Sequence, residues 1–195
     1  MLVLASASPR RSDLLRKAGI VFDICPADVP EIPVEGELPG AFAERVAQEK
    51  ALAVWRQRPT DFVLGADTIV VVNGTLLGKP RDKADAVRML RMLSGRKHEV
   101  ITAVCLIGPH RQDSDTKNPL FVDVRSETTT VTMKSISAAE IQAYVASGEP
   151  MDKAGAYAIQ GGAAMWIPEI QGDHSNVVGL PVSLVRTMLQ ERGAI

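Results

Sequence analysis

The amino-acid sequence predicts a mixed α/β fold, in which a twisted sheet is flanked by helices. Three observations lead to this prediction. Short apolar runs typical of buried strands alternate along the chain with segments of helical spacing. The longest apolar run, at residues 62–72, is followed by Asn73-Gly74, a dipeptide typical of tight hairpins. Such a hairpin adds an antiparallel pair to a sheet that the alternation of strands and helices would otherwise make parallel.

Length, charge and cysteine content limit the class of protein. The 195 residues suit a single domain, residues 1–195, which we expect to have two lobes around a central cleft. The net charge is −1, so we expect neither a nucleic-acid partner nor a membrane partner, since both are usually bound through a basic excess. Cys25 and Cys105 are expected to be buried reduced thiols. No apolar run reaches the ~18 residues of a membrane helix, and a cytoplasmic location is expected.

Local patterns define the expected elements. Apolar runs bounded by turn residues predict strands at residues 2–5, 20–25, 62–72, 75–77, 98–107, 120–133 and 165–170. Helical spacing predicts helices at residues 9–18, 41–56, 84–93, 138–147 and 181–191. Ser8 and Ser137 are the expected N-caps, and Glu140 completes a capping box with Ser137. The proline-rich, acidic segment 26–39 predicts a surface loop over a site, and the polar segment 108–119 predicts a protruding loop.

The first candidate site is the segment ASASPRR at residues 5–11, where a strand turns into a helix. Small residues let an anion approach free backbone N–H groups, while Ser6, Arg10 and Arg11 add a hydroxyl and two guanidinium groups. This combination favours phosphate binding. The alternative is an ordinary capped helix with solvated arginines. Neither the P-loop pattern nor the G-x-G-x-x-G pattern is present.

The second candidate is Asp67, which interrupts the most apolar stretch of the chain. A buried carboxylate is unfavourable without a partner, so three interpretations remain open. Asp67 is a metal ligand or general base, a member of a buried ion pair, or a residue at a strand end that meets water.

Lysines form the third candidate group. On a helical wheel of residues 41–56, Glu49 falls within the apolar stripe and Lys50 at its edge, a conflict of pattern and chemistry that is typical of sites. Lys79 and Lys153 lie among glycine, proline and alanine. The three could converge on a polyphosphate, although a solvated lysine is the commoner case. Surface or supporting roles are expected for the histidines, which are His98, His110 and His174.

Six segments in order resemble the Maf family of nucleoside triphosphate pyrophosphatases. They are ASASPRR, GADTIV, LGKP, LSGRKHEV, SGEPMDKAGAYAIQG and GDHSNVVGLP, and they cover most of the chain. The resemblance implies a fold related to that of the inosine triphosphate pyrophosphatases. It implies hydrolysis of a nucleoside triphosphate to the monophosphate and pyrophosphate, a divalent cation (Mg²⁺ or Mn²⁺) as cofactor, and a homodimer. Alternatives are the same chemistry on 7-methylguanosine triphosphate or another modified nucleotide, and a nucleotide-binding regulator of cell division.

The resemblance also implies roles for single residues. Asp67 matches the general base of the family, and Asp67 with Glu31 would hold the metal. Lys50 and Lys79 match basic positions at the phosphate site, to which Ser6 and Arg11 of the first loop would also contribute. The signature of the subgroup that acts on dTTP and UTP is matched by Arg10, Thr68 and Gln160. Ala158 departs from the family pattern, in which glycine is usual.

Overall fold

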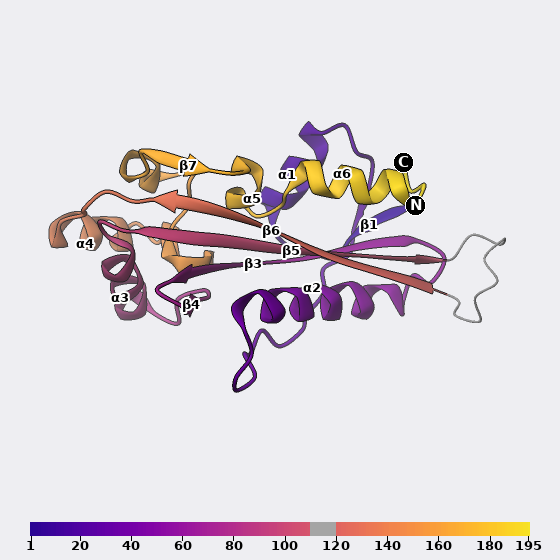
Figure 1. Cartoon of the computed structure of the whole chain (residues 1–195), viewed down its shortest axis with the longest axis horizontal. Helices are drawn as coiled ribbons and strands as arrows, with labels where there is room; N and C mark the ends of the chain where they lie inside the picture. Colours follow the sequence, from indigo (N-terminus) through magenta and orange to yellow (C-terminus); the bar gives the residue numbers. More distant parts are fainter. Residues whose placement is uncertain (110–119) are drawn as a thin grey trace. The chain divides into compact units, whose positions relative to one another are not determined.

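The computed structural model describes residues 1–109 and 120–195 (Figure 1). Its strands are β1 (Leu2–Leu4), β2 (Asp23–Ile24), β3 (Phe62–Val72), β4 (Thr75–Leu77), β5 (Lys97–Pro109), β6 (Leu120–Thr132) and β7 (Glu169–Gln171). Its α-helices are α1 (Pro9–Lys17), α2 (Pro39–Trp55), α3 (Lys83–Leu93), α4 (Ala138–Ala146), α5 (His174–Val178) and α6 (Val182–Glu191). Three short 3-10 helices lie between α4 and β7, namely η1 (Glu149–Asp152), η2 (Ala154–Ala156) and η3 (Gly162–Trp166).

The strands form one mixed sheet, which confirms the predicted fold class. Their order is β2-β1-β3-β5-β6-β7, with β4 paired to β3. β1 runs parallel to both β2 and β3, with Leu4 opposite Ile24 on one side and Leu64 on the other. The β3–β4 and β6–β7 pairs are antiparallel. Both parallel and antiparallel pairing are therefore present, as the combination of helical connections and a hairpin requires.

Several local predictions are confirmed. β3 and β4 have the predicted bounds, and the turn between them places both Asn73 (φ 50°) and Gly74 (φ 74°) in the left-handed region that a two-residue hairpin favours. The capping box of α4 is present, because Ser137 Oγ accepts from the Glu140 N–H and the Glu140 carboxylate accepts from the Ser137 N–H. Segment 26–38 contains neither helix nor strand.

Other predictions are wrong in part. The strand expected at 20–25 is reduced to β2, and the strand expected at 165–170 is replaced by the end of η3 and by β7. The short helix α5 was not predicted. Gly108 and Pro109 belong to β5, while the rest of the predicted loop lies outside the described residues. Ser8 is at the N-cap of α1 but its side chain makes no capping bond; instead its N–H donates to Ser6 Oγ at 3.2 Å.

The chain divides into two compact units. The first comprises Met1–Asp67, Thr102–Glu127 and Gly179–Ile195, and the second comprises Thr68–Ile101 and Thr128–Val178. Each has its own apolar core. In the first unit β1, β3 and β5 pack against α1 and α6 through residues such as Leu4, Leu15 and Leu189. In the second unit α3 and α4 lie side by side (Figure 1), and their residues Leu90 and Ile141 share one core cluster with Val70 of β3. The expected cleft between two lobes stays a prediction.

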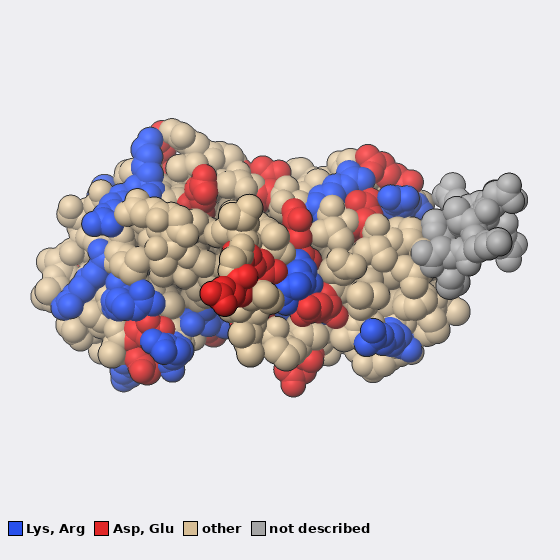
Figure 2. Space-filling view, turned by 60° about the horizontal axis from the view of Figure 1, so that its bottom comes forward, with Lys and Arg blue, Asp and Glu red and all other residues tan. Residues whose placement is uncertain are grey.

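The surface carries both signs of charge. On the face that Figure 2 shows, acidic and basic side chains are interspersed over the described residues, in keeping with the net charge of −1. In the described part of the chain, no helix combines the length and the apolar character needed to cross a bilayer.

A glycine allows α2 to approach β3 closely. The buried face of α2 carries the small residues Ala43, Ala47 and Ala51, which are spaced four residues apart. Gly65 of β3 lies against this face, where a Cβ atom would overlap the Ala47 carbonyl oxygen and come within 2.8 Å of the Ala51 nitrogen. The missing side chain therefore sets the separation of helix and strand two residues before Asp67.

We expect Gly65→Ala to destabilise the protein by about 1–3 kcal/mol, because the added methyl group meets backbone atoms that cannot rotate away. Gly40→Ala in the first turn of α2 is the matched control, since a Cβ at Gly40 meets nothing within 4 Å. That control should leave the stability equal or raise it by up to ~1 kcal/mol. Urea denaturation of both variants measures the difference, and equal midpoints would show that the close contact does not constrain α2.

Candidate functional site

A buried lysine joins two carboxylates in the first unit. Lys50 Nζ donates to Asp67 Oδ1 at 2.7 Å and to Glu31 Oε1 at 2.7 Å. The Lys50 and Asp67 side chains are only 9% and 7% exposed, whereas that of Glu31 is 33% exposed. The group therefore connects α2, the middle of β3 and the acidic loop 26–38. Of the three interpretations of Asp67, a strand end in water is wrong and the buried ion pair is present.

Burial and charge act in opposite directions on Asp67. Burial raises the pKa of its carboxyl group above the ordinary value, and this is the largest effect. Lys50 lowers the pKa through its charge and its hydrogen bond, and Arg11 lowers it further through charge. The net direction is upward. A carboxylate with a raised pKa holds a proton more readily than an ordinary aspartate, which is the property that a general base needs.

Arg11 is the second buried cation of the first unit. Its Nε donates to the Gly179 carbonyl at 2.8 Å, and its Nη1 donates to Ser6 Oγ at 3.1 Å and to the Ala66 carbonyl at 2.9 Å. Burial lowers the pKa of Arg11, while the charges of Asp67 and Glu31 raise it. Arg11 thus joins the first loop to β3 and to the segment before α6, beside the Lys50–Asp67 pair.

The structure brings five of the predicted site residues together in the first unit, namely Ser6, Arg11, Glu31, Lys50 and Asp67. Arg10 adjoins them as the second residue of α1. The remaining predicted residues, Thr68, Lys79 and Gln160, belong to the second unit.

Within the second unit, a backbone hydrogen bond joins two of the predicted segments. The Gly155 N–H donates to the Gly78 carbonyl at 3.0 Å, so the turn that carries Lys79 lies against the DKAG segment. Gly155 has a φ of +67°, and a Cβ there would lie 2.9 Å from the Val70 side chain. This close approach explains the glycine. Lys79 and Gln160 are both exposed, and Thr68 is half-buried.

The carboxylate oxygens around Lys50 suit a hard divalent cation. Two carboxylates, Asp67 and Glu31, converge on one ammonium group, so the site already accommodates positive charge. Mg²⁺ is usually held by one or two carboxylates together with substrate phosphates and water. Among the described residues there is no cluster of three or more His, Cys, Asp or Glu side chains that could hold a metal. The pair therefore fits a metal that shares its coordination with a bound phosphate.

Several side chains differ from their predicted settings. Glu49, expected within the apolar stripe, is 39% exposed and pairs with Arg45. Lys50, expected at its edge, is buried because the two carboxylates replace water around its ammonium group.

His98 is buried and lies 2.8 Å from the Tyr157 hydroxyl, and burial lowers its pKa to about 4. Lys153 pairs with Asp152. Cys105 is buried, whereas Cys25 is half-buried.

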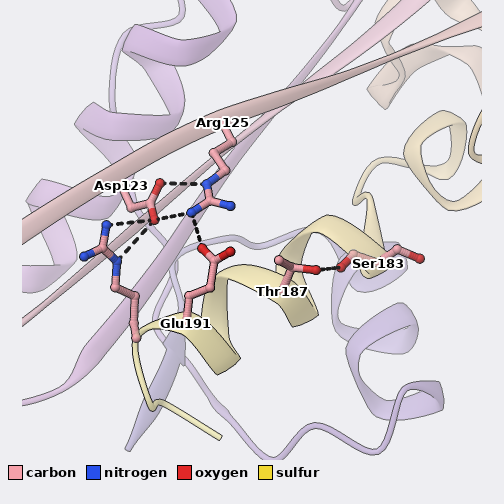
Figure 3. Close-up of polar contacts among 6 residues, drawn as sticks. Asp123, Arg125, Ser183, Thr187 and Glu191 are labelled. Carbon is pink, nitrogen blue, oxygen red and sulfur yellow. Dashed lines mark hydrogen bonds and ion pairs between the residues drawn. The ribbon is translucent and has the colours of Figure 1, made fainter.

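A charged cluster that sequence reasoning missed lies elsewhere in the first unit. Asp123 of β6 receives bidentate hydrogen bonds from Arg125, which also pairs with Glu191 of α6 (Figure 3). Arg192 donates to Asp123 Oδ2 at 3.1–3.2 Å. These arginines lower the pKa of Asp123, although burial opposes them. The cluster fastens the end of α6 to the sheet. Alternating polar residues in β6 were its only sign in the sequence.

Comparison with known proteins places the chain in a family. The family model described as "Maf-like protein" matches residues 1–192. The chain belongs to the Maf-like protein family. Maf-like relatives share about half of their residues with it. One from Koribacter versatilis, named dTTP/UTP pyrophosphatase, is 53% identical over the whole chain and 95% of its own length. Two others with that name, from Geobacter sulfurreducens and Syntrophomonas wolfei, are each 50% identical, over 100% and 97% of the chain and 97% and 96% of their own lengths.

A solved structure with a weaker likeness to this Maf-like chain is that of the Staphylococcus aureus Ham1 protein. It is 13% identical, with a TM-score of 0.43, over 97% of this chain and 98% of that one. The expected relation to the inosine triphosphate pyrophosphatase fold stays a prediction.

We expect Lys50→Met to destabilise the Maf-like chain by about 3 kcal/mol at neutral pH, because it leaves a buried carboxylate without its cation. Removal of Lys50 raises the pKa of Asp67 further. A folded-state pKa above the ordinary 3.8 makes folding less favourable as the pH rises from that value through the folded pKa. The loss of stability should therefore be largest at neutral pH and shrink towards pH 4.

Denaturation at several pH values measures this difference. The control is Lys17→Met, which replaces an exposed lysine and should change stability by less than about 0.5 kcal/mol at every pH. A Lys50→Met deficit that does not vary with pH would contradict the assigned coupling to Asp67.

Proposed function

We propose that this chain is a nucleoside triphosphate pyrophosphatase, a hydrolase of acid anhydrides that acts on dTTP and UTP and yields the nucleoside monophosphate and pyrophosphate. The names of relatives about 50% identical over the full chain support this function. In the structure, the observation that supports it best is the Lys50 ammonium held between Asp67 and Glu31. A buried carboxylate with a raised pKa beside two cations suits attack of water on a phosphate.

The reaction assigns a task to each group of the first unit. A water oxygen forms a bond to the α-phosphorus, and the bond from this phosphorus to the α–β bridging oxygen breaks. Asp67 takes the water proton on Oδ2, because Oδ1 already accepts from Lys50. Lys50 and Arg10 stabilise the negative charge that develops on the phosphate oxygens. Pyrophosphate then leaves. Arg11 and Ser6 act mainly by holding the loop and β3 in place.

A divalent metal belongs to this proposal. Asp67 and Glu31 would hold it together with phosphate oxygens, and Mg²⁺ or Mn²⁺ would supply charge neutralisation and a more acidic water. Lys50 keeps the two carboxylates within one hydrogen-bond distance of a shared point, so they are ordered before any cation arrives. The cytoplasmic location and the homodimer stay predictions.

In the second unit, three predicted residues have the chemistry that contacts to a nucleotide require. Lys79 carries an exposed ammonium group that suits a terminal phosphate. The exposed amide of Gln160 offers a donor and an acceptor, which suit the edge of a pyrimidine. Thr68, which directly follows Asp67 in β3, carries a hydroxyl group that can both donate and accept a hydrogen bond.

We expect the wild-type protein with Mg²⁺ or Mn²⁺ to release pyrophosphate from dTTP and UTP faster than from other nucleoside triphosphates, 7-methylguanosine triphosphate included.

Asp67→Asn should lower kcat by about 10²-fold or more, since it removes the proton acceptor. The variant should stay folded, because Lys50 keeps its ion pair with Glu31 and the asparagine amide oxygen can still accept a hydrogen bond from Lys50. Pyrophosphate release measures the rates, and circular dichroism checks folding. Near-normal turnover by a folded Asp67→Asn protein would remove Asp67 from the reaction.

Specificity provides a separate prediction. Gln160→Glu should lower kcat/KM for dTTP and UTP by roughly 5- to 150-fold, because a carboxylate cannot donate the hydrogen bond that the amide donates. The release of pyrophosphate from purine nucleotides should change less. An unchanged ratio of pyrimidine to purine turnover would show that Gln160 does not contact the base.

A further inference from the structure

Gln160 lies in a turn whose shape is fixed by one backbone hydrogen bond. The Gly161 N–H donates to the Ala158 carbonyl at 3.2 Å, which closes a four-residue turn over residues 158–161. Gln160 occupies the third position of this turn and is exposed. An isolated turn of this kind is a weak structure, so the direction of the Gln160 side chain depends on what holds the two ends of the turn.

Two side chains of the second unit hold those ends. The Ala158 N–H donates to the Tyr144 hydroxyl at 3.2 Å, and this hydroxyl donates to Glu149 Oε1 at 2.9 Å. The Gly162 N–H donates to the same carboxylate, at 3.0 Å to Oε1 and 3.2 Å to Oε2. One continuous hydrogen-bond network therefore runs from the residue at the start of the turn to the residue just after it.

The parts of this network are themselves well fixed. Tyr144 of α4 is 7% exposed, and its ring packs edge-on against Trp166 of η3 with centroids 5.2 Å apart. Gly161 leaves the space that the Glu149 carboxylate occupies, because a Cβ at this position would overlap Oε1 and lie 2.6 Å from Cδ. The glycine therefore serves the carboxylate as well as the turn.

We propose that Tyr144 and Glu149 are positioning residues for substrate specificity, which hold the 158–161 turn so that the Gln160 amide is presented to the pyrimidine. This inference rests on the proposed function. The two residues do not touch the nucleotide in this scheme; they act by fixing the ends of the turn. Glu149→Ala or Tyr144→Phe should therefore weaken pyrimidine recognition, and Glu149→Gln should not, because its amide keeps an oxygen that accepts from Tyr144 and Gly162.

Amide hydrogen exchange tests the network directly, without any substrate. In Glu149→Ala and in Gly161→Ala, which displaces the carboxylate, the Gly162 amide should exchange about 10-fold faster or more, since its acceptor is lost. The matched control is Ser94→Ala, which removes a side-chain acceptor from the Ile136 N–H in the same unit. It should leave the Gly162 amide unchanged. Unchanged exchange at Gly162 in both glutamate-displacing variants would overturn the network.

Kinetics test the link to Gln160. Glu149→Ala and Tyr144→Phe should each raise KM for dTTP and lower the ratio of kcat/KM for dTTP to that for dATP by about 10-fold, because a displacement of about 1 Å is enough to lose such a contact. Ser94→Ala and Glu149→Gln should keep the wild-type ratio within about twofold. In a Gln160→Ala background the Glu149→Ala change should produce no further loss, since the side chain that it positions is absent.

The outcomes separate the two claims. A wild-type protein that releases no pyrophosphate from any nucleoside triphosphate overturns the proposed function, and with it the role of Gln160. An active wild-type protein whose pyrimidine preference survives Glu149→Ala overturns the positioning inference alone. So does a loss of preference that Glu149→Ala adds in full to Gln160→Ala, because the network would then act through some other group.

Discussion

The first unit depends on a charge balance around one ammonium group. Lys50 would be strongly unfavourable in the apolar layer between α2 and β3 without Asp67 and Glu31, and Asp67 would be equally unfavourable without Lys50. The Gly65 contact lets α2 come close enough to the strand for the pair to form. Removal of one partner therefore affects the packing of helix, strand and acidic loop together, which ties the chemistry of the site to the stability of the unit.

The two units differ in how their candidate side chains are held in place. In the first unit the charged groups of Arg11, Lys50 and Asp67 are buried, and they are oriented by ion pairs and by hydrogen bonds to backbone carbonyls, such as those from Arg11 to Ala66 and Gly179. In the second unit Lys79 and Gln160 are exposed and lie on turns, whereas Thr68 is half-buried in β3. The turns that carry these two residues are ordered by hydrogen bonds, such as those to the Glu149 carboxylate, and by the close approach of side chains to the Gly155 and Gly161 backbone. Buried charges suit a fixed chemical step, whereas exposed turns suit recognition of variable groups.

Sequence patterns predicted the features that depend on residues close together in the sequence. The β3–β4 hairpin, the capping box at Ser137 and the oddity of Asp67 could all be predicted, because each depends on a few neighbouring residues. The lengths of β2 and β7 could not, since each depends on pairing with a strand that lies about 20 or more residues away in the sequence. The helical wheel placed Lys50 at the edge of the stripe, and only its partners, 17 and 19 residues away, explain its burial. The Asp123 cluster joins β6 to α6 across a long sequence separation that no local pattern encodes.

The composition of the first unit from distant segments bears on how the protein is made. Arg11 donates its Nε hydrogen bond to a carbonyl that lies 168 residues further along the chain. At 5–20 residues per second, a ribosome adds Gly179 roughly 10–30 s after Arg11. During that interval the N-terminal segments lack α6 and its apolar face, whereas every segment of the second unit is synthesised by Val178. The order of synthesis therefore completes the second unit first and leaves the unit that carries Asp67 dependent on a segment that is synthesised later.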